Sequence, residues 1–144
     1  MLIYKQQTAQ NIIEIGKRLI KVKESLPHGE WGTYLKEKVV FSRQSANRFM
    51  QVAREFSNCS ALSNLQPTKI FALLDVPSEE REDFISQSHE INGQTKTVDE
   101  MTSRELQKAI KEKKQLEEQV RIQKESKYYN KTIMSYLRSF KLRL

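Results

Sequence analysis

Residues 31–56 decide how this chain folds, and they read WGTYLKEKVVFSRQSANRFMQVAREF. The spacing of the apolar residues predicts two short helices in this stretch. We expect the first to turn Trp31, Tyr34 and Leu35 inward, and residues 39–41 to form a tight apolar connection. Ser42 is a typical N-cap for the second helix, which should run to about Phe56.

The same stretch matches the spacing of a helix-turn-helix, in which apolar residues hold two short helices at a steep angle. Counted from Gly32, apolar side chains are expected at the fourth, eighth, tenth, fifteenth and eighteenth places. These places hold Leu35, Val39, Phe41, Ala46 and Phe49. The departures are Lys36 and Val40, which stand where a small residue and a glycine are usual. A helical hairpin of another kind could also satisfy five apolar positions.

The second helix of this pair carries side chains suited to DNA. At about 100° per residue, an inward face of Ala46, Phe49 and Ala53 turns another set outward. The outward set is Gln44, Asn47, Arg48 and Gln51. Arg can pair with guanine, and Asn or Gln with adenine, so the set suits base readout.

The start of this helix suits phosphate, because backbone N–H groups and the helix dipole attract anions there. Ser42, Arg43 and Ser45 occupy that end. Glu55 lies on the outward face and would repel phosphate, so contacts should concentrate in the first half of the helix. The alternative interpretation is that these polar residues only solvate an exposed helix face.

On the N-terminal side, residues 4–26 predict an amphipathic helix. Its apolar stripe consists of Ile12, Ile15, Leu19, Val22 and Leu26. Pro27 and Gly29 should end it.

On the C-terminal side, residues 57–60 indicate a break, and a helix should begin near Pro67. We expect Pro77 and Ser78 to end that helix and cap the next one, in which Phe84 and Ile85 pack inward. Residues 88–100, which include Asn92-Gly93, predict a flexible loop.

Residues 102–105, Thr-Ser-Arg-Glu, form a capping box that should begin one long helix, to about Ser126. Its heptads are imperfect, because with Leu106 at position a, Lys113 and Lys127 also fall at a and Gln123 at d. A stable coiled coil of this helix alone is therefore doubtful, although the helix could supply a homodimer contact. The stretch after it, residues 127–144, has five Lys and Arg and no acid.

Composition supports an all-α protein, since good helix formers dominate and only 4 Gly and 3 Pro occur among 144 residues. We expect a small helical DNA-binding domain over residues 1–100, with the helix-turn-helix at about 30–56. A long basic C-terminal helix and tail should follow over residues 101–144.

The net charge of +7 is unevenly distributed along the chain. Lys and Arg outnumber Asp and Glu by 10 to 5 in residues 1–56 and by 12 to 5 in residues 101–144, whereas residues 57–100 hold 3 against 8. Phosphate contact therefore belongs to the basic ends, and the acidic middle should face protein or solvent.

Several runs of this sequence resemble a bacterial family known only as a domain of unknown function. The runs are residues 11–24, 26–32, 41–50, 61–65, 73–81 and 101–106. Members of that family occur on plasmids, conjugative elements and prophages, and the resemblance covers about residues 5–120. The order of elements is also similar to the DNA-binding core of ParB partition proteins. The arginine-rich nucleotide-binding motif of ParB is missing from this sequence, so no CTPase activity is implied.

Enzymatic function is not expected. His28 and His89 have no companions at metal-ligand spacing, and Cys59 has no visible base. The sequence holds no P-loop, dinucleotide-binding turn or Gly-x-Ser-x-Gly motif. We expect no cofactor, no metal, no membrane span and a cytoplasmic location. Trp31 is expected to be a core residue.

These features leave alternative functions open. The first is sequence-specific binding of double-stranded DNA, in a regulatory, partition or transfer role on a plasmid, phage or conjugative element. The second is a helical module that binds and inhibits a host protein such as a defence nuclease. A third gives the tail, residues 128–144, a role as a basic amphipathic helix on membranes or other anionic partners.

Overall fold

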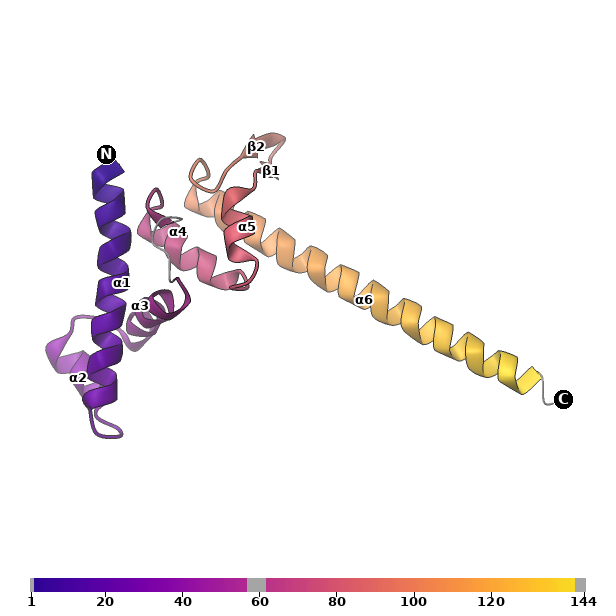
Figure 1. Cartoon of the computed structure of the whole chain (residues 1–144), viewed down its shortest axis with the longest axis horizontal. Helices are drawn as coiled ribbons and strands as arrows, with labels where there is room; N and C mark the ends of the chain where they lie inside the picture. The colour runs from indigo at the N-terminus through magenta and orange to yellow at the C-terminus, as the bar shows by residue number, and fades with distance from the viewer. Residues whose placement is uncertain (1, 57–61, 142–144) are drawn as a thin grey trace. The chain divides into compact units, whose positions relative to one another are not determined.

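The computed structural model describes the backbone of residues 2–56 and 62–141, and the side chains of residues 8–56 and 62–141. This part of the chain is mainly helical, as predicted, and its two strands form a single hairpin (Figure 1). The elements are α1 (Leu2–Ser25), α2 (Trp31–Lys38), α3 (Arg43–Glu55), α4 (Pro67–Ala72), η2 (Leu73–Asp75), α5 (Arg81–Ser86), β1 (His89–Ile91), β2 (Gln94–Lys96) and α6 (Ser103–Lys141). The expected break at residues 57–60, with Cys59, lies outside the described residues.

The chain divides into two compact units, Met1–Gln107 and Lys108–Leu144. The first unit holds every element from α1 to the first residues of α6, and the described residues of the second unit are the rest of α6.

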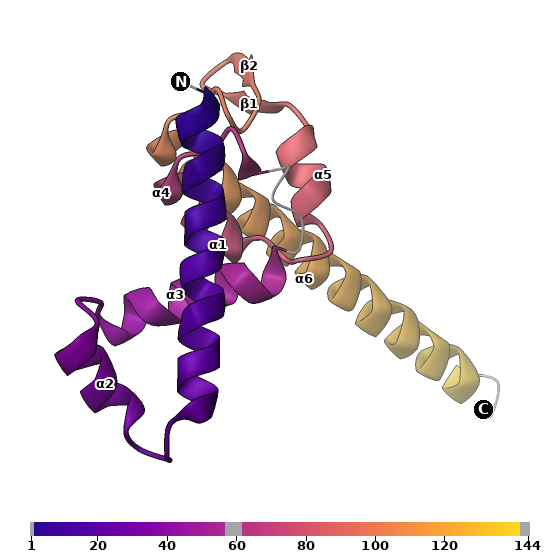
Figure 2. The same cartoon turned by 60° about the vertical axis from the view of Figure 1, so that its left-hand side comes forward.

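Helix α1 crosses α3 closely, as Figure 2 shows within the first unit. The predicted stripe faces inward, with Ile12 and Leu19 buried and the other three positions partly buried. Gly16 makes the close crossing possible, because a Cβ at this position would lie 2.1 Å from the backbone oxygen of Phe49. Two helix backbones can approach this closely only where a side chain is missing.

A sharp turn separates α1 from α2. Gly29 has a φ of +95°, a conformation that glycine adopts readily, and the backbone N–H of Glu30 donates to the carbonyl of Pro27. Trp31 and Leu35 are buried in α2, as expected. The connection after α2 differs from the prediction at Val40, which is fully exposed, because an extended backbone at Val39 sends successive side chains to opposite sides.

The expected loop at residues 88–100 instead contains an ordered β-hairpin. His89 pairs with Lys96, Glu90 with Thr95 and Ile91 with Gln94. Asn92 and Gly93 have positive φ angles of 52° and 76°, as a two-residue turn of this kind requires. The prediction of a flexible loop was therefore wrong. Asn-Gly favours the tight turn of a hairpin, and here it joins the two strands.

The cap expected at Ser78 is also absent. Residues 78–80 form a turn, and α5 begins two residues later than predicted, with Glu80 at its N-cap position. The Ser78 hydroxyl donates instead to the carboxylate of Glu79. Phe84 is buried in α5 and Ile85 is partly buried, as expected.

The predicted capping box begins α6. The backbone N–H of Thr102 donates to Glu105 Oε2 at 2.7 Å, and the backbone N–H of Glu105 donates to Thr102 Oγ1 at 3.2 Å. The helix continues to Lys141, so the expected end near Ser126 was wrong. Neither Gly nor Pro follows Gly93 in the sequence, and nothing else in it stops the helix.

Candidate nucleic-acid interface

Helix α3 begins at a well-formed N-cap. Ser42 has an extended backbone, and its Oγ accepts a hydrogen bond from the backbone N–H of Ser45 at 3.1 Å. The two hydroxyls are 2.9 Å apart and bond to each other. The cap fixes where the helix starts, and it leaves the N–H groups of Arg43 and Gln44 at the open end, where a helix has no acceptors of its own.

One apolar cluster fixes the inward face of α3. Its buried members are Leu19, Trp31, Leu35, Ala46 and Met50. The five places with apolar helix-turn-helix spacing all belong to this cluster, with Leu35 and Ala46 buried and the other three partly buried. The cluster therefore joins α1, α2 and α3, and it determines which face of α3 remains outside.

The outward face of α3 is a continuous polar surface. It carries Arg43, Gln44, Asn47, Arg48, Gln51 and Arg54, all exposed. At about 100° per residue these side chains span an arc of roughly 140°. We call this arc the α3 polar face. Ser45 is half-buried at its edge, and Ser42 is exposed at its start.

Four side chains of the α3 polar face that were predicted from the sequence are unengaged. Within residues 8–56 and 62–141, Arg43, Gln44, Asn47 and Arg48 have no hydrogen-bond or ion-pair partner. Exposed polar groups without internal partners are free to bind a ligand. These four lie on the first two turns of the helix, beside its open N–H groups.

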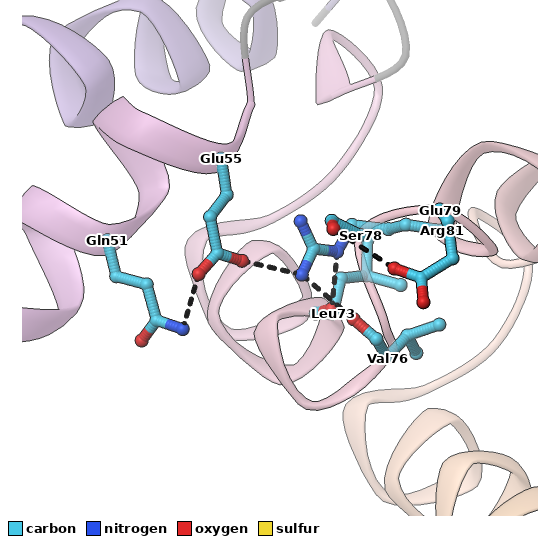
Figure 3. A network of polar contacts seen from close by, with 7 residues as sticks. All are labelled: Gln51, Glu55, Leu73, Val76, Ser78, Glu79 and Arg81. Carbon is cyan, nitrogen blue, oxygen red and sulfur yellow. Dashed lines mark hydrogen bonds and ion pairs between the residues drawn. The ribbon is translucent and has the colours of Figure 1, made fainter.

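Gln51, the last of the four residues predicted to read bases, has an internal partner (Figure 3). Its Nε2 donates to Glu55 Oε1 at 2.8 Å, and Glu55 Oε2 accepts from Arg81 Nη2 at 2.7 Å. The carboxylate that was expected to repel phosphate is thus paired with a guanidinium.

Sequence reasoning did not find the role of Arg81. Its side chain is only 5% exposed, and its Nε and Nη2 donate to the carbonyls of Leu73 and Val76 as well as to Glu55 (Figure 3). Its guanidinium also lies 4.5 Å from the ring centre of Phe56. The sequence signal that could have indicated this role is that Arg81 is the single arginine in the acidic segment at residues 57–100. Arg54, which was also missed, could have been found by extending the periodicity of the outward face.

Two other residues singled out in the sequence, His89 and Trp31, make contacts within the fold. His89 Nε2 lies 2.8 Å from the carbonyl oxygen of Phe84, and its ring centre is 4.2 Å from that of Phe84. Trp31 is buried in the apolar cluster, as expected, and Lys23 Nζ lies 5.8 Å from its ring centre.

The described residues include no group of three or more His, Cys, Asp and Glu that could hold a metal ion. None of the helices in the described part of the chain is long and apolar enough to cross a membrane.

Comparison with family models gives a match over residues 3–113 to DUF3102, described as a protein of unknown function. The chain belongs to the DUF3102 family. The match includes the α3 polar face, the apolar cluster and Arg81, and it ends within α6. No curated protein and no solved structure matches this DUF3102 chain.

Proposed function

We propose that this DUF3102 protein binds double-stranded DNA in a sequence-specific manner and reads the major groove with α3. The observation that carries the proposal is the group of four unengaged side chains on one face of that helix: Arg43, Gln44, Asn47 and Arg48. Two are cations and two are amides, which is the combination that base edges and phosphates accept.

The proposal assigns different tasks to the two ends of this group. Ser42, Arg43 and Ser45 lie at the helix N-terminus, where N–H groups and the dipole favour phosphate. Gln44, Asn47 and Arg48 come next, and their amide and guanidinium groups suit adenine and guanine. Gln51 would have to leave Glu55 to reach a base, so its contribution should be smaller.

The surroundings of α3 support a helix-turn-helix interpretation of α2, its connection and α3. A groove-reading helix must be held rigidly, and the cluster around Leu35 and Ala46 supplies this from two neighbouring helices. The pairing of Glu55 with Arg81 supports the same function, because it neutralises the one acid that α3 carries on its outward face.

We further propose a regulatory, partition or transfer role on a plasmid, phage or conjugative element. This part rests on the resemblance of the six sequence runs described above.

The test is fluorescence anisotropy of labelled duplex DNA, first random and then selected from a random pool, at two salt concentrations. The wild type is compared with Gln44→Ala/Arg48→Ala. The matched control is Gln10→Ala/Arg18→Ala, which removes one amide and one cation from exposed positions of α1. We expect salt-sensitive binding that enriches one sequence, with the preference lost only in the α3 variant.

Two results would contradict the proposal. One is an absence of binding at low salt, and the other is binding that responds equally to the α3 variant and its control. Either result would favour the module that binds a host protein, and the acidic segment at residues 57–100 would then be the surface to test for a partner.

A further inference from the structure

The C-terminal half of α6 carries a regular apolar stripe. Its positions follow one another at alternating steps of four and three residues, and we call them the C-terminal seam. They are Ile122, Ser126, Tyr129, Ile133, Tyr136 and Phe140. The five large side chains are between 52% and 72% exposed. A row of large apolar side chains that is this regular and this exposed indicates a surface that another molecule covers.

The spacing of the seam is that of a coiled coil. Alternating steps of four and three give the 3.5-residue repeat that keeps one stripe facing a partner helix. Ser126, Ile133 and Phe140 then occupy a positions, and the other three occupy d positions. The heptads counted from Leu106 run along a different line and place Lys127 at a. Continued upstream, the seam register places Gln119, Glu112 and Glu105 at a, so the seam is confined to residues 122–140.

We propose that the C-terminal seam binds the seam of a second copy of this chain in an antiparallel coiled coil. Antiparallel packing places each a position beside a d position of the partner. With the two-fold axis next to Lys131, Phe140 meets the partner's Ile122, Tyr136 meets the partner's Ser126, and Ile133 meets the partner's Tyr129. All six positions of each copy are then used.

The sizes of the side chains favour this direction over a parallel pair. In a parallel pair, each residue faces the identical residue of the partner helix. Ser126 would then face a second Ser126 and leave a void, and Tyr129 and Tyr136 would each face another tyrosine ring. The antiparallel pair places the one small residue against a tyrosine, and large beside small is how helix layers fill space. Antiparallel helices also have opposed dipoles.

The area is sufficient for a specific but weak dimer. Aromatic side chains can bury about 150–250 Å² each, and each copy contributes three of them to the seam. With their present partial exposure, full contact would cover on the order of 1,000 Å² over both chains, which is near the lower limit for specific interfaces.

The basic residues of this segment do not obstruct the seam. Lys127, Lys131 and Arg138 lie on the opposite side of the helix, roughly 130° or more from the centre of the seam, and Lys141 lies about 100° from it. They still repel the basic residues of a second copy at longer range, and salt screens that repulsion.

The first test is sedimentation equilibrium of the full chain at about 1 to 100 µM. Ile133→Gln changes two layers of the proposed dimer, since each copy places this residue against the partner's Tyr129. Its matched control is Met134→Gln, because Met134 is 56% exposed and Ile133 54%, but Met134 lies off the seam. We expect at least tenfold weaker association for Ile133→Gln and less than twofold change for the control, with unchanged helix content in both.

The second test gives the direction of the pair, in chains in which Cys59→Ser removes the native thiol. Mixing a Ser126→Cys chain with a Tyr136→Cys chain should give a mixed disulfide dimer, and Ser126→Cys alone should give little. Efficient cross-linking of Ser126→Cys to itself would overturn the antiparallel arrangement. A chain that stays monomeric at about 100 µM, or one that binds vesicles of anionic lipid through the seam instead, would overturn the self-association itself.

Discussion

Gly16 has no Cβ, and the backbone of α3 lies where a Cβ would otherwise project. A Cβ there would lie 2.1 Å from the oxygen of Phe49 and 2.6 Å from the Cβ of Ala53. Gly16→Ala should therefore force α1 and α3 apart and lower the free energy of unfolding by about 3 kcal/mol. Urea denaturation followed by the fluorescence of Trp31, which lies in the cluster between these helices, measures the change.

Gly32→Ala is the matched control for this prediction. Gly32 lies in α2, and nothing is found within 4 Å of the position its Cβ would take. Alanine is the better helix former, so this variant should be equally stable or up to about 1 kcal/mol more stable than the wild type. Equal stability of the two variants would mean that the helices do not cross this closely.

Arg81 is the second residue whose replacement should have a large effect. Arg81→Met can still pack against Phe56, but the carbonyl of Val76 and Glu55 Oε2 lose their guanidinium donor, and the carbonyl of Leu73 keeps the backbone N–H of Val76. We expect a loss of about 2–4 kcal/mol in the free energy of unfolding. Chemical denaturation measures it, with Arg54→Met as the exposed control, for which a change within about 0.5 kcal/mol is expected.

A double variant separates the ion pair from the other contacts of Arg81. Glu55→Gln/Arg81→Met should regain part of the stability lost in Arg81→Met, because the unpaired carboxylate is then gone. If the double variant regains nothing, the loss comes from the two carbonyls alone, and the ion pair contributes little.

At the scale of elements, the start of α6 makes the first unit sensitive to acid. The ammonium group of Lys96 in β2 donates to Glu105, and with the N–H and hydroxyl of Thr102 it lowers the pKa of Glu105 from 4.5 to about 2. A carboxylate with a lowered pKa stabilises the fold above its unfolded pKa, and this stabilisation is lost as pH falls through the folded pKa. Its contribution should therefore disappear between about pH 4.5 and pH 2.

Glu105→Gln should remove this part of the acid sensitivity. Denaturation midpoints measured from pH 6 to about pH 2 should fall less steeply in the variant than in the wild type. Glu112→Gln, which removes a carboxylate from an exposed position of the same helix, is the control. A variant curve parallel to that of the wild type would show that the contact with Lys96 does not persist in solution.

The same scale shows why sequence reasoning succeeded for some elements and failed for others. Helices α1 to α3 were predictable because their apolar periods are regular and Ser42 is a strong cap. The hairpin was missed because its strands have three residues each, too few for alternation to be visible. The end of α6 was misplaced although no Gly or Pro stands between Ser126 and Lys141 to stop the helix.

The candidate site was predictable only where it depends on one helix. A period of about 100° per residue is enough to select the outward residues of α3. The contact between Glu55 and Arg81 joins residues that are 26 positions apart, and no local pattern encodes it. The engagement of Gln51 depends on the same contact, and it therefore also required the structure.

At the scale of the whole molecule, the three basic residues of the acidic segment at residues 57–100 make contacts that stabilise the fold. Lys69 donates to the carbonyls of Val98 and Asp99, and Arg81 and Lys96 are paired with Glu55 and Glu105. The three cations of residues 57–100 are thus buried or partly buried, whereas most of its acids are exposed. The alternation of basic, acidic and basic segments is therefore stronger at the surface than in the composition.

This charge distribution leads to opposite salt responses for the two proposed activities. DNA binding through about four phosphates should weaken roughly 100-fold between about 50 and 200 mM salt, because fewer counterions are released. Self-association through the C-terminal seam should strengthen over the same range, because salt screens the basic segments from each other. Anisotropy and sedimentation on one preparation measure both, and a parallel decline would mean that self-association is electrostatic.

The turn at Asn92 and Gly93 offers a practical opportunity. Both residues are exposed, they are far along the chain from α3 and from the C-terminal seam, and the strands on either side are short. Loop tips of this kind tolerate inserted sequence well. A peptide epitope or a dye-binding tag placed between them would let the protein be followed in cells and in single-molecule experiments, with both of its proposed binding surfaces left intact.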